Sequence, residues 1–424
     1  MRAMSPTTTV LQVLFTQGPL SRSQIAAATG LNPATVTRLT QALIDEGMVE
    51  EGRTRVEARQ PGRRAIELHL RTDRTFVAGL VVNAYAQTVA IADIVGRTVA
   101  ECDVPRLAGA SARETLMALA AAAVDLAAAN AVPRERIVGT GVLAAGLVTQ
   151  DPNVVLKSPD IGWFDVAVDD PVRAVLDVPV VLETMQNGLN LAECAYGRAA
   201  GTAHAMLVSV ALGIGSSLIV DDRLIRGAGQ AASGFGHMPV AGAERPCNCG
   251  RRGCLTTLAA GYAVLCSLGL VEPYRTARDH DPAYAPLLAD VLARAETGDP
   301  DASEALGAAG EALGEALKAA SAVAAPEVII LSGPVPRAAS YREGVERGLA
   351  PSPRDPFGWG GRLLVSDTPL ASAAARLALE RFVYGRIPEL PPAASRHLPR
   401  SVPGDRSASG PRRPPRPLRE GPSL

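Results

Sequence analysis

The sequence predicts an α/β protein with a small helical domain at its N-terminus and a disordered tail at its C-terminus. Three short amphipathic segments fill residues 7–50, and strands alternate with helices from Thr75 onward. Such alternation is typical of an α/β domain with a mixed sheet. After about Pro388 the chain is rich in Pro, Arg and Ser and buries too little apolar surface to fold. The expected parts are a small helical domain at 1–72, an α/β domain at 73–387 and a disordered tail at 388–424.

The first two helices have clear sequence signals. An apolar run from Val10 to Phe15 predicts the first helix. Ser21 and Gln24 have the spacing of a capping box, in which each side chain bonds the other's backbone N–H, so a second helix begins there. Gly30 ends it, since glycine readily takes the left-handed conformation that follows a helix.

A third helix is expected from Asn32 and Pro33, as N-cap and first helical residue, to Gly47. Two helices joined by a tight turn form a helix-turn-helix, although three-helix patterns also occur in cores that bind no DNA. Polar side chains on the outer face of the third helix are candidates for contacts to bases and phosphates in the major groove. These candidates are Thr35, Thr37, Arg38 and Gln41.

Two strand-like runs, Met48–Glu51 and Ala65–Leu70, flank a basic loop and predict a β-wing. At its tip, Pro61 and Gly62 precede Arg63 and Arg64. Two guanidinium groups on a narrow loop suit an A·T-rich minor groove. The alternative is a solvated charged loop. We expect a winged helix-turn-helix.

From Thr75 onward, apolar runs of strand length alternate with helical segments. Expected strands are 76–82, 88–92, 99–104, 136–141, 178–182, 206–212, 217–220 and 328–331. Expected helices are 110–129, 187–197 and 302–325.

One imidazole and three thiols lie close together in the sequence: His237, Cys247, Cys249 and Cys254. They match the ligand set of a closed tetrahedral zinc site, in which protein fills all four positions, so the role of the zinc is structural. The alternative is four residues that are merely near in sequence. No secretory signal opens the chain, which favours reduced thiols and therefore metal binding for this cluster.

The segment that holds this cluster resembles the ROK family of sugar kinases and sugar-responsive repressors. The resemblance extends to about Tyr384 and depends on five short motifs. They are Gly236-His237-Met238, Cys247–Leu255, Val178–Glu183, Gly162-Trp163 and Gly213–Gly215. It implies a two-lobed, actin-like and ribonuclease-H-like module. An N-terminal helix-turn-helix places the chain with the repressor branch.

The resemblance also shows which kinase parts are replaced. The family's general base is an Asp, and Met185 stands there with a thioether that has no basic lone pair. The first phosphate loop has become Val81–Tyr85, without carboxylate or glycine. Leu212 replaces a hydroxyl in the second loop, and the adenosine-side glycine run has become Ser332-Gly333-Pro334. ATP-dependent phosphotransfer is therefore not expected. An active sugar kinase with an accessory DNA-binding domain is the alternative.

The sugar-contacting positions implied by the resemblance have also changed. A sugar in a cleft must have its hydroxyls paired, and several of the usual polar side chains are absent here. The cleft therefore takes a sugar, a less polar ligand or none, and in the last case a protein partner controls the regulator. The candidate effector residues are Gly146, Asp160, Thr184, Gly234 and Thr256.

Composition agrees with a soluble globular protein: 47% of residues are apolar, 20% are charged and the net charge is −1. No segment has the apolar length of a membrane span. We expect a cytoplasmic transcriptional regulator, a homodimer or tetramer, with a double-stranded DNA operator, a sugar-like effector and structural zinc. The basic tail either adds non-specific DNA affinity or has no role.

Overall fold

The computed structural model describes residues 5–52, 66–84, 86–158, 161–228, 234–274, 283–351 and 358–387. The predicted tail and the tip of the predicted wing lie outside these residues. None of the helices in the described ranges is both long and apolar enough to cross a bilayer.

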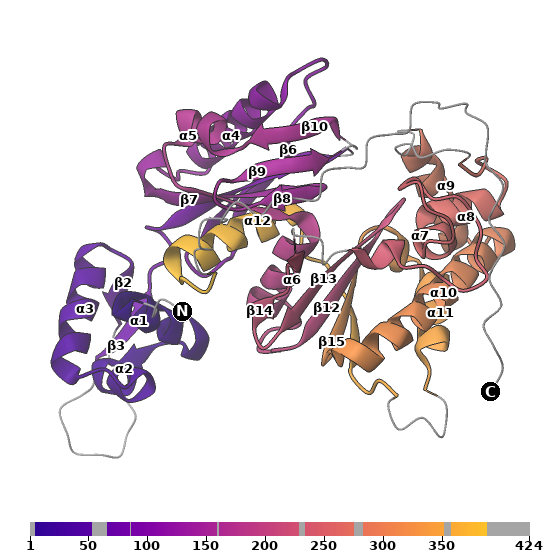
Figure 1. The fold of residues 1–424 in the computed structure, drawn as a ribbon. Coiled ribbons are helices and arrows are strands. Elements are labelled where there is room, and N and C mark those ends of the chain that lie inside the picture. Colours follow the sequence, from indigo (N-terminus) through magenta and orange to yellow (C-terminus); the bar gives the residue numbers. More distant parts are fainter. Residues whose placement is uncertain are drawn as a thin grey trace, which may run out of the picture. The chain divides into compact units, whose positions relative to one another are not determined.

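The N-terminal domain has three helices and a small antiparallel sheet (Figure 1). Both predicted caps form: Ser21 and Gln24 make the capping box, and Asn32 accepts a hydrogen bond from the Ala34 N–H at 2.8 Å. The sheet has the order β1-β3-β2. The helices are α1 (Pro6–Gln17), α2 (Arg22–Thr29) and α3 (Pro33–Asp45), and the strands are β1 (Leu20–Ser21), β2 (Val49–Glu51) and β3 (Glu67–Leu70).

The first lobe is built on a five-stranded sheet with the order β11-β7-β4-β5-β6. Three strands pair antiparallel and two join them in parallel. The strands are β4 (Phe76–Val82), β5 (Gln87–Asp93), β6 (Thr98–Asp103), β7 (Ile137–Ala144) and β11 (Val180–Thr184). Also in this lobe are α4 (Ala112–Ala129), α5 (Asp169–Leu176) and a small sheet of β8 (Leu147–Thr149), β9 (Val154–Ser158) and β10 (Trp163–Ala167).

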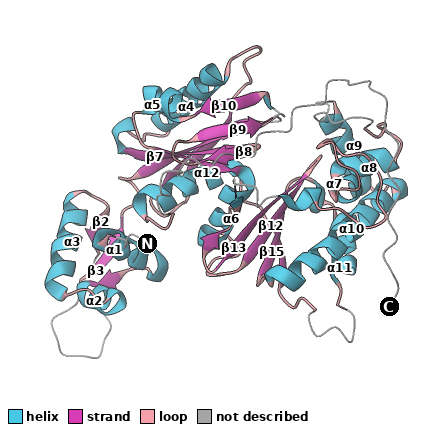
Figure 2. Ribbon diagram, in the orientation of Figure 1, coloured by secondary structure: helices cyan, strands magenta, loops and turns pink. Residues whose placement is uncertain are grey.

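The second lobe repeats this topology, with the order β14-β13-β12-β15-β16. Again three strands are antiparallel and two are parallel. The strands are β12 (Ala205–Val210), β13 (Ile214–Val220), β14 (Arg223–Leu224), β15 (Val328–Ser332) and β16 (Arg362–Val365). Its helices are α7 (Thr256–Ala259), α8 (Gly261–Ser267), α9 (Tyr284–Glu296), α10 (Pro300–Ala324) and α11 (Ala339–Leu349). Two copies of one strand order give the two-lobed architecture that the resemblance implies, and Figure 2 shows both sheets.

Helices α6 (Met185–Tyr196) and α12 (Leu370–Ala378) connect the lobes. Helix α12, yellow in Figure 1, packs on the first sheet. A Cβ atom at Gly79 or Gly141 would collide with the backbone of α12, so these glycines permit the close approach. Beyond α12 the chain reaches the N-terminal domain, where Gln12 Nε2 donates a hydrogen bond to the Tyr384 carbonyl at 2.7 Å.

Some elements differ from the sequence prediction. Ile214 and Gly215 were expected between strands, but β13 begins at Ile214, which pairs with Val210. Helix α6 begins at Met185 rather than Asn187. The prediction contained no helix at α12, an alanine-rich segment whose residues are nearly all buried between other elements.

Candidate functional sites

The outer face of α3 carries the four side chains predicted to contact DNA. Thr37, Arg38 and Gln41 are exposed and Thr35 is half-buried. The Thr37 hydroxyl donates to the Pro33 carbonyl and Gln41 Nε2 donates to Asp45 Oδ1, each at 2.9 Å. Arg38 has no ion-pair partner in the described part of the chain, so its guanidinium is available to a ligand.

The helix pair itself is fixed by Arg22 at the start of α2. Its Nε donates to the Thr40 hydroxyl at 3.1 Å, and its Nη2 lies 2.9 Å from a carboxylate oxygen of Glu51. Arg22 thus joins α2 to α3 and to strand β2, which leads toward the wing. Arg63 and Arg64 lie outside the described residues, so their placement stays a prediction.

The metal-ligand cluster converges as the sequence predicts. The ligand atoms of His237, Cys247, Cys249 and Cys254 all lie within 4.8 Å of one another. Cys247 Sγ is 3.5 Å from His237 Nδ1, and the Sγ atoms of Cys249 and Cys254 are 3.7 Å apart. Zn–S bonds of about 2.3 Å and Zn–N bonds of about 2.0 Å at tetrahedral angles span such separations. The donor set and its spacing therefore fit a tetrahedral metal ion.

The loop reaches this geometry through backbone pairing. The Cys247 N–H donates to the Arg251 carbonyl at 2.8 Å, and the Gly253 N–H donates to the Arg245 carbonyl at 3.0 Å. Gly250 and Gly253 have φ angles of +90° and +66°, a region that side chains disfavour. These two positions let the chain reverse so that three sulfurs face one point.

The pKa values of the three thiols shift in different directions. Burial raises the pKa of Cys247 to about 12 and also raises that of Cys254. Burial acts on Cys249 too, but hydrogen bonds from the Arg251 backbone and side chain outweigh it and lower its pKa. Burial, with the nearby Arg251 charge, lowers the pKa of His237, which favours the neutral imidazole that binds metals.

A cavity of about 770 Å³ lies between the two lobes. Of the predicted effector residues, Gly146 and Thr256 line it. Thr184 and Gly234 are not among the lining residues, and Asp160 lies outside the described chain. The Thr184 hydroxyl instead accepts a hydrogen bond from the Asn187 N–H at 3.3 Å and caps α6. His237 also lines the cavity, so the metal cluster forms part of its wall.

No Asp or Glu lines the cavity in the described ranges. At the position of the family's base, Met185 Sδ accepts a hydrogen bond from Asn83 Nδ2 at 3.7 Å. Asn83 belongs to the former first phosphate loop, so two replaced residues contact each other. Met185 and Asn83 offer neither a proton acceptor of useful basicity nor a carboxylate for Mg²⁺.

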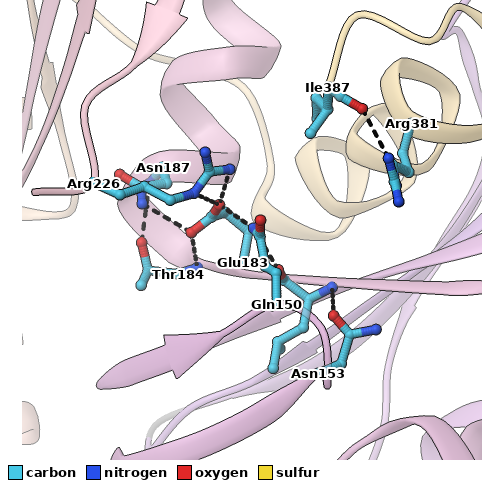
Figure 3. Close-up of polar contacts among 9 residues, drawn as sticks. Gln150, Asn153, Glu183, Thr184, Asn187, Arg226, Arg381 and Ile387 are labelled. Atoms are coloured by element: carbon cyan, nitrogen blue, oxygen red, sulfur yellow. Dashed lines mark hydrogen bonds and ion pairs between the residues drawn. The ribbon is translucent and has the colours of Figure 1, made fainter. Parts of the chain in front are cut away.

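Glu183, next to the former base, is occupied by hydrogen bonds. It is 1% exposed, and its carboxylate receives bonds from Arg226 at 2.7 Å, Asn187 at 2.8 Å and the Thr184 N–H at 3.0 Å (Figure 3). Gln150 Nε2 donates to it as well. With these partners, the Glu183 carboxylate stabilises the fold and is not free to accept a proton from a substrate.

Three features of the cavity were not predicted. Helix α9 lines it with Ala285, Leu288, Ala289 and Leu292, whose spacing of i, i+3, i+4 and i+7 was visible in the sequence as an apolar helix face. Arg337 lines it at the end of a 3-10 helix, Val335–Arg337. Among the described residues the buried Thr256 hydroxyl has no hydrogen-bond partner, which no sequence pattern reveals.

The chain is similar in sequence to two proteins that are named as transcriptional regulators. The xylose repressor of Caldicellulosiruptor bescii is 27% identical over 60% of this chain, and the match spans 64% of that repressor's length. The Escherichia coli DNA-binding transcriptional dual regulator NagC is 26% identical over 78% of this chain and 80% of its own length.

Among solved structures, a ROK family transcriptional regulator, a homologue of the E. coli MLC protein, has a TM-score of 0.71. It is 22% identical and covers 90% of this chain and 96% of its own, which shows a shared fold. Sugar kinases of the family share the fold of the two lobes.

Two family descriptions match separate parts of the chain. The IclR helix-turn-helix domain matches residues 7–53, which contain α1 to α3. The ROK family matches residues 85–356, more than half of the chain. The protein therefore belongs to the ROK family, with a helix-turn-helix domain at its N-terminus.

Proposed function

We propose that the protein is a DNA-binding transcriptional regulator, a repressor, that senses a small molecule in the cavity between its lobes. The observation that carries the proposal is the outer face of α3, where Arg38 is exposed and unpaired in the described chain between Thr37 and Gln41. The relatives named as a xylose repressor and as a DNA-binding transcriptional dual regulator support it. Residues 1–72 would read DNA, and residues 73–387 would dimerise and bind the effector.

The sugar-kinase-like module would be inactive as an enzyme. Phosphoryl transfer needs a nucleophile held by a base and a metal held by carboxylates. The cavity wall offers Met185 where a base is required, and the carboxylate two residues before it, Glu183, is paired with Arg226. The fold shared with ROK kinases supports the kinase alternative.

The cluster of His237, Cys247, Cys249 and Cys254 would hold zinc. The ion would supply a crosslink between the loop and the segment that precedes it, and protein ligands would leave no position for a substrate water. Because His237 and Asn248 also line the cavity, this crosslink would fix one wall of the effector site.

We propose that a homodimer binds a pseudo-palindromic operator, since two-fold symmetric proteins read two half-sites. The protein would work in the cytoplasm, where its DNA is. Arg63 and Arg64 would enter the minor groove from the wing.

The test begins with selection of bound duplexes from a random DNA library by the full-length chain. Arg38→Ala is then compared with wild type by gel shift on the selected sequence. We expect a loss of about 1–3 kcal/mol in binding free energy. The control is Arg113→Ala, an exposed arginine on α4. The proposal would be contradicted if the chain selected no DNA sequence. It would also be contradicted if Arg38→Ala and Arg113→Ala bound the selected sequence with equal affinity.

The effector is tested separately, by thermal melting of the full chain with a panel of sugars and sugar phosphates. A ligand that binds the folded state raises the melting temperature. A panel without any effect would favour the alternative in which a protein partner controls the regulator.

A further inference from the structure

The cavity between the lobes is lined by side chains of different chemistry. Thr256 lines it, is 2% exposed and has a hydroxyl without a hydrogen-bond partner in the described structure. His237 and Asn248 line the cavity as well. A buried hydroxyl without a partner costs free energy unless a ligand or water satisfies it. The Thr256 hydroxyl is therefore suited to a hydroxyl-bearing ligand.

The wall formed by α9 is apolar. Ala285, Leu288, Ala289 and Leu292 follow one another at the spacing of a single helix face, and all four line the cavity. Leu212, which replaces a hydroxyl-bearing residue of the family's phosphate loop, lines it too. A wall of this kind favours an apolar group, because burying such a group against it removes apolar surface from water.

One guanidinium is the strongest charge on the cavity wall. Arg337 is exposed, lines the cavity and forms no ion pair within the part of the chain that the structure describes. No carboxylate lines the cavity there to neutralise it. The wall is therefore electrostatically favourable for an acidic group.

The volume of the cavity also indicates the size of the ligand. At about 770 Å³, the cavity falls in the range of roughly 300–1,000 Å³ that encloses ligands much larger than one sugar ring. Because the phosphate loops are replaced, the cavity is not suited to bind a nucleoside triphosphate beside the effector. One ligand with a polar and an apolar part would contact both Thr256 and the α9 wall.

We propose that the effector is a glycoside with an apolar aglycone, preferably one that ends in an acidic group. The sugar ring would bond Thr256, the aglycone would lie against the α9 face, and the acid would approach Arg337. This inference rests on the proposed function, because it names the ligand class of the same effector site.

The experiment measures binding of the full-length protein to three series by calorimetry. Each series contains a free sugar, its phenyl glycoside and its 4-carboxyphenyl glycoside, for glucose, xylose and N-acetylglucosamine. Phenol and 4-hydroxybenzoate are measured alone. In at least one series we expect the phenyl glycoside to bind at least about tenfold tighter than the free sugar. The carboxyl group adds roughly two- to fivefold, as expected for a partly exposed ion pair.

Four variants test which residues cause these gains in affinity. Ala289→Phe adds a ring to the apolar α9 wall at an exposed helix position and should remove the gain from the phenyl group. Ala293→Phe is the matched control, exposed on the same helix but not on the cavity wall. Arg337→Gln should remove the gain from the carboxyl group, and Arg337→Lys should keep most of it.

Thr256→Val tests the contact to the sugar, since it keeps the shape of the side chain and removes the hydroxyl. It should weaken the free sugar and its glycosides by the same factor. Equal affinity of free sugars and phenyl glycosides would overturn the inference, and so would phenol binding as tightly as the glycosides.

Operator binding by the same preparation separates the two proposals. A chain that selects DNA but binds no glycoside overturns the inference and leaves the regulator intact. A chain that binds glycosides but selects no DNA overturns the regulator and leaves the ligand class standing.

Discussion

The carboxylate of Glu183 and the guanidinium of Arg226 form an ion pair 2.7 Å long between the two lobes. Glu183 lies on β11, an edge strand of the first sheet, and Arg226 follows β14, an edge strand of the second. The side chain of Glu183 is 1% exposed and that of Arg226 is 16% exposed. The pair therefore connects two sheet edges while it keeps the carboxylate from acting as a base.

Arg226→Met should lower the free energy of unfolding by about 3 kcal/mol, because it leaves a buried carboxylate without its cation. Urea denaturation at neutral pH measures this. Adding Glu183→Gln should recover part of the loss, since the buried charge is then gone. Arg173→Met, at an exposed site on α5, is the control. Unchanged stability in Arg226→Met would show that the pair does not hold the lobes.

Cys249→Ser should abolish zinc binding and lower the melting temperature, because a structural zinc site contributes its binding energy to folding. Elemental analysis of the purified protein should give about one zinc per chain for wild type and none for the variant. Cys266→Ser, a half-buried cysteine outside the cluster, should retain the metal. Full zinc content and unchanged melting in Cys249→Ser would refute the assignment.

Wild type should show no phosphotransfer from ATP to any sugar in a coupled assay, since Met185 cannot remove a proton. Met185→Asp should remain inactive, because the segment Val81–Tyr85 still lacks the carboxylate of the first phosphate loop and Leu212 still replaces the hydroxyl of the second. A ROK glucokinase serves as the positive control for the assay. Turnover by wild type would revive the kinase alternative.

The double variant Arg63→Ala/Arg64→Ala should weaken operator binding and reduce the slope of log K against log salt concentration by about 2, if each arginine neutralises one phosphate. Fluorescence anisotropy at several salt concentrations measures the slope. Circular dichroism checks that the fold is kept. An unchanged slope would mean that the wing does not contact the DNA backbone.

The helix-turn-helix could be predicted because its signals are local. A cap depends on groups within three residues, and the Ser21–Gln24 box and the Asn32 cap both form as expected. The four metal-ligand candidates also lie in one short segment, and the glycines between them allow the loop to close. The family resemblance supplied the two-lobed fold, which strand periodicity alone does not specify.

The cavity was predicted only in part. Gly146 and Thr256 line it, whereas Thr184 is used as the N-cap of α6. The α9 face and Arg337 come from segments that no local pattern connects to Gly146. Which polar side chains meet a ligand depends on how distant segments pack.

The sequence by itself determined the chemistry that each residue can perform. Met185 cannot act as a base, and three thiols with an imidazole can bind zinc, whatever the fold. Only the tertiary structure decided which groups share a site: Glu183 with Arg226, and Thr256 with α9 and Arg337. The physical reason is the separation along the chain of the residues that interact. Caps and turns depend on bonds between near neighbours, whereas the cavity and the pair between the lobes depend on contacts between residues that are far apart along the chain.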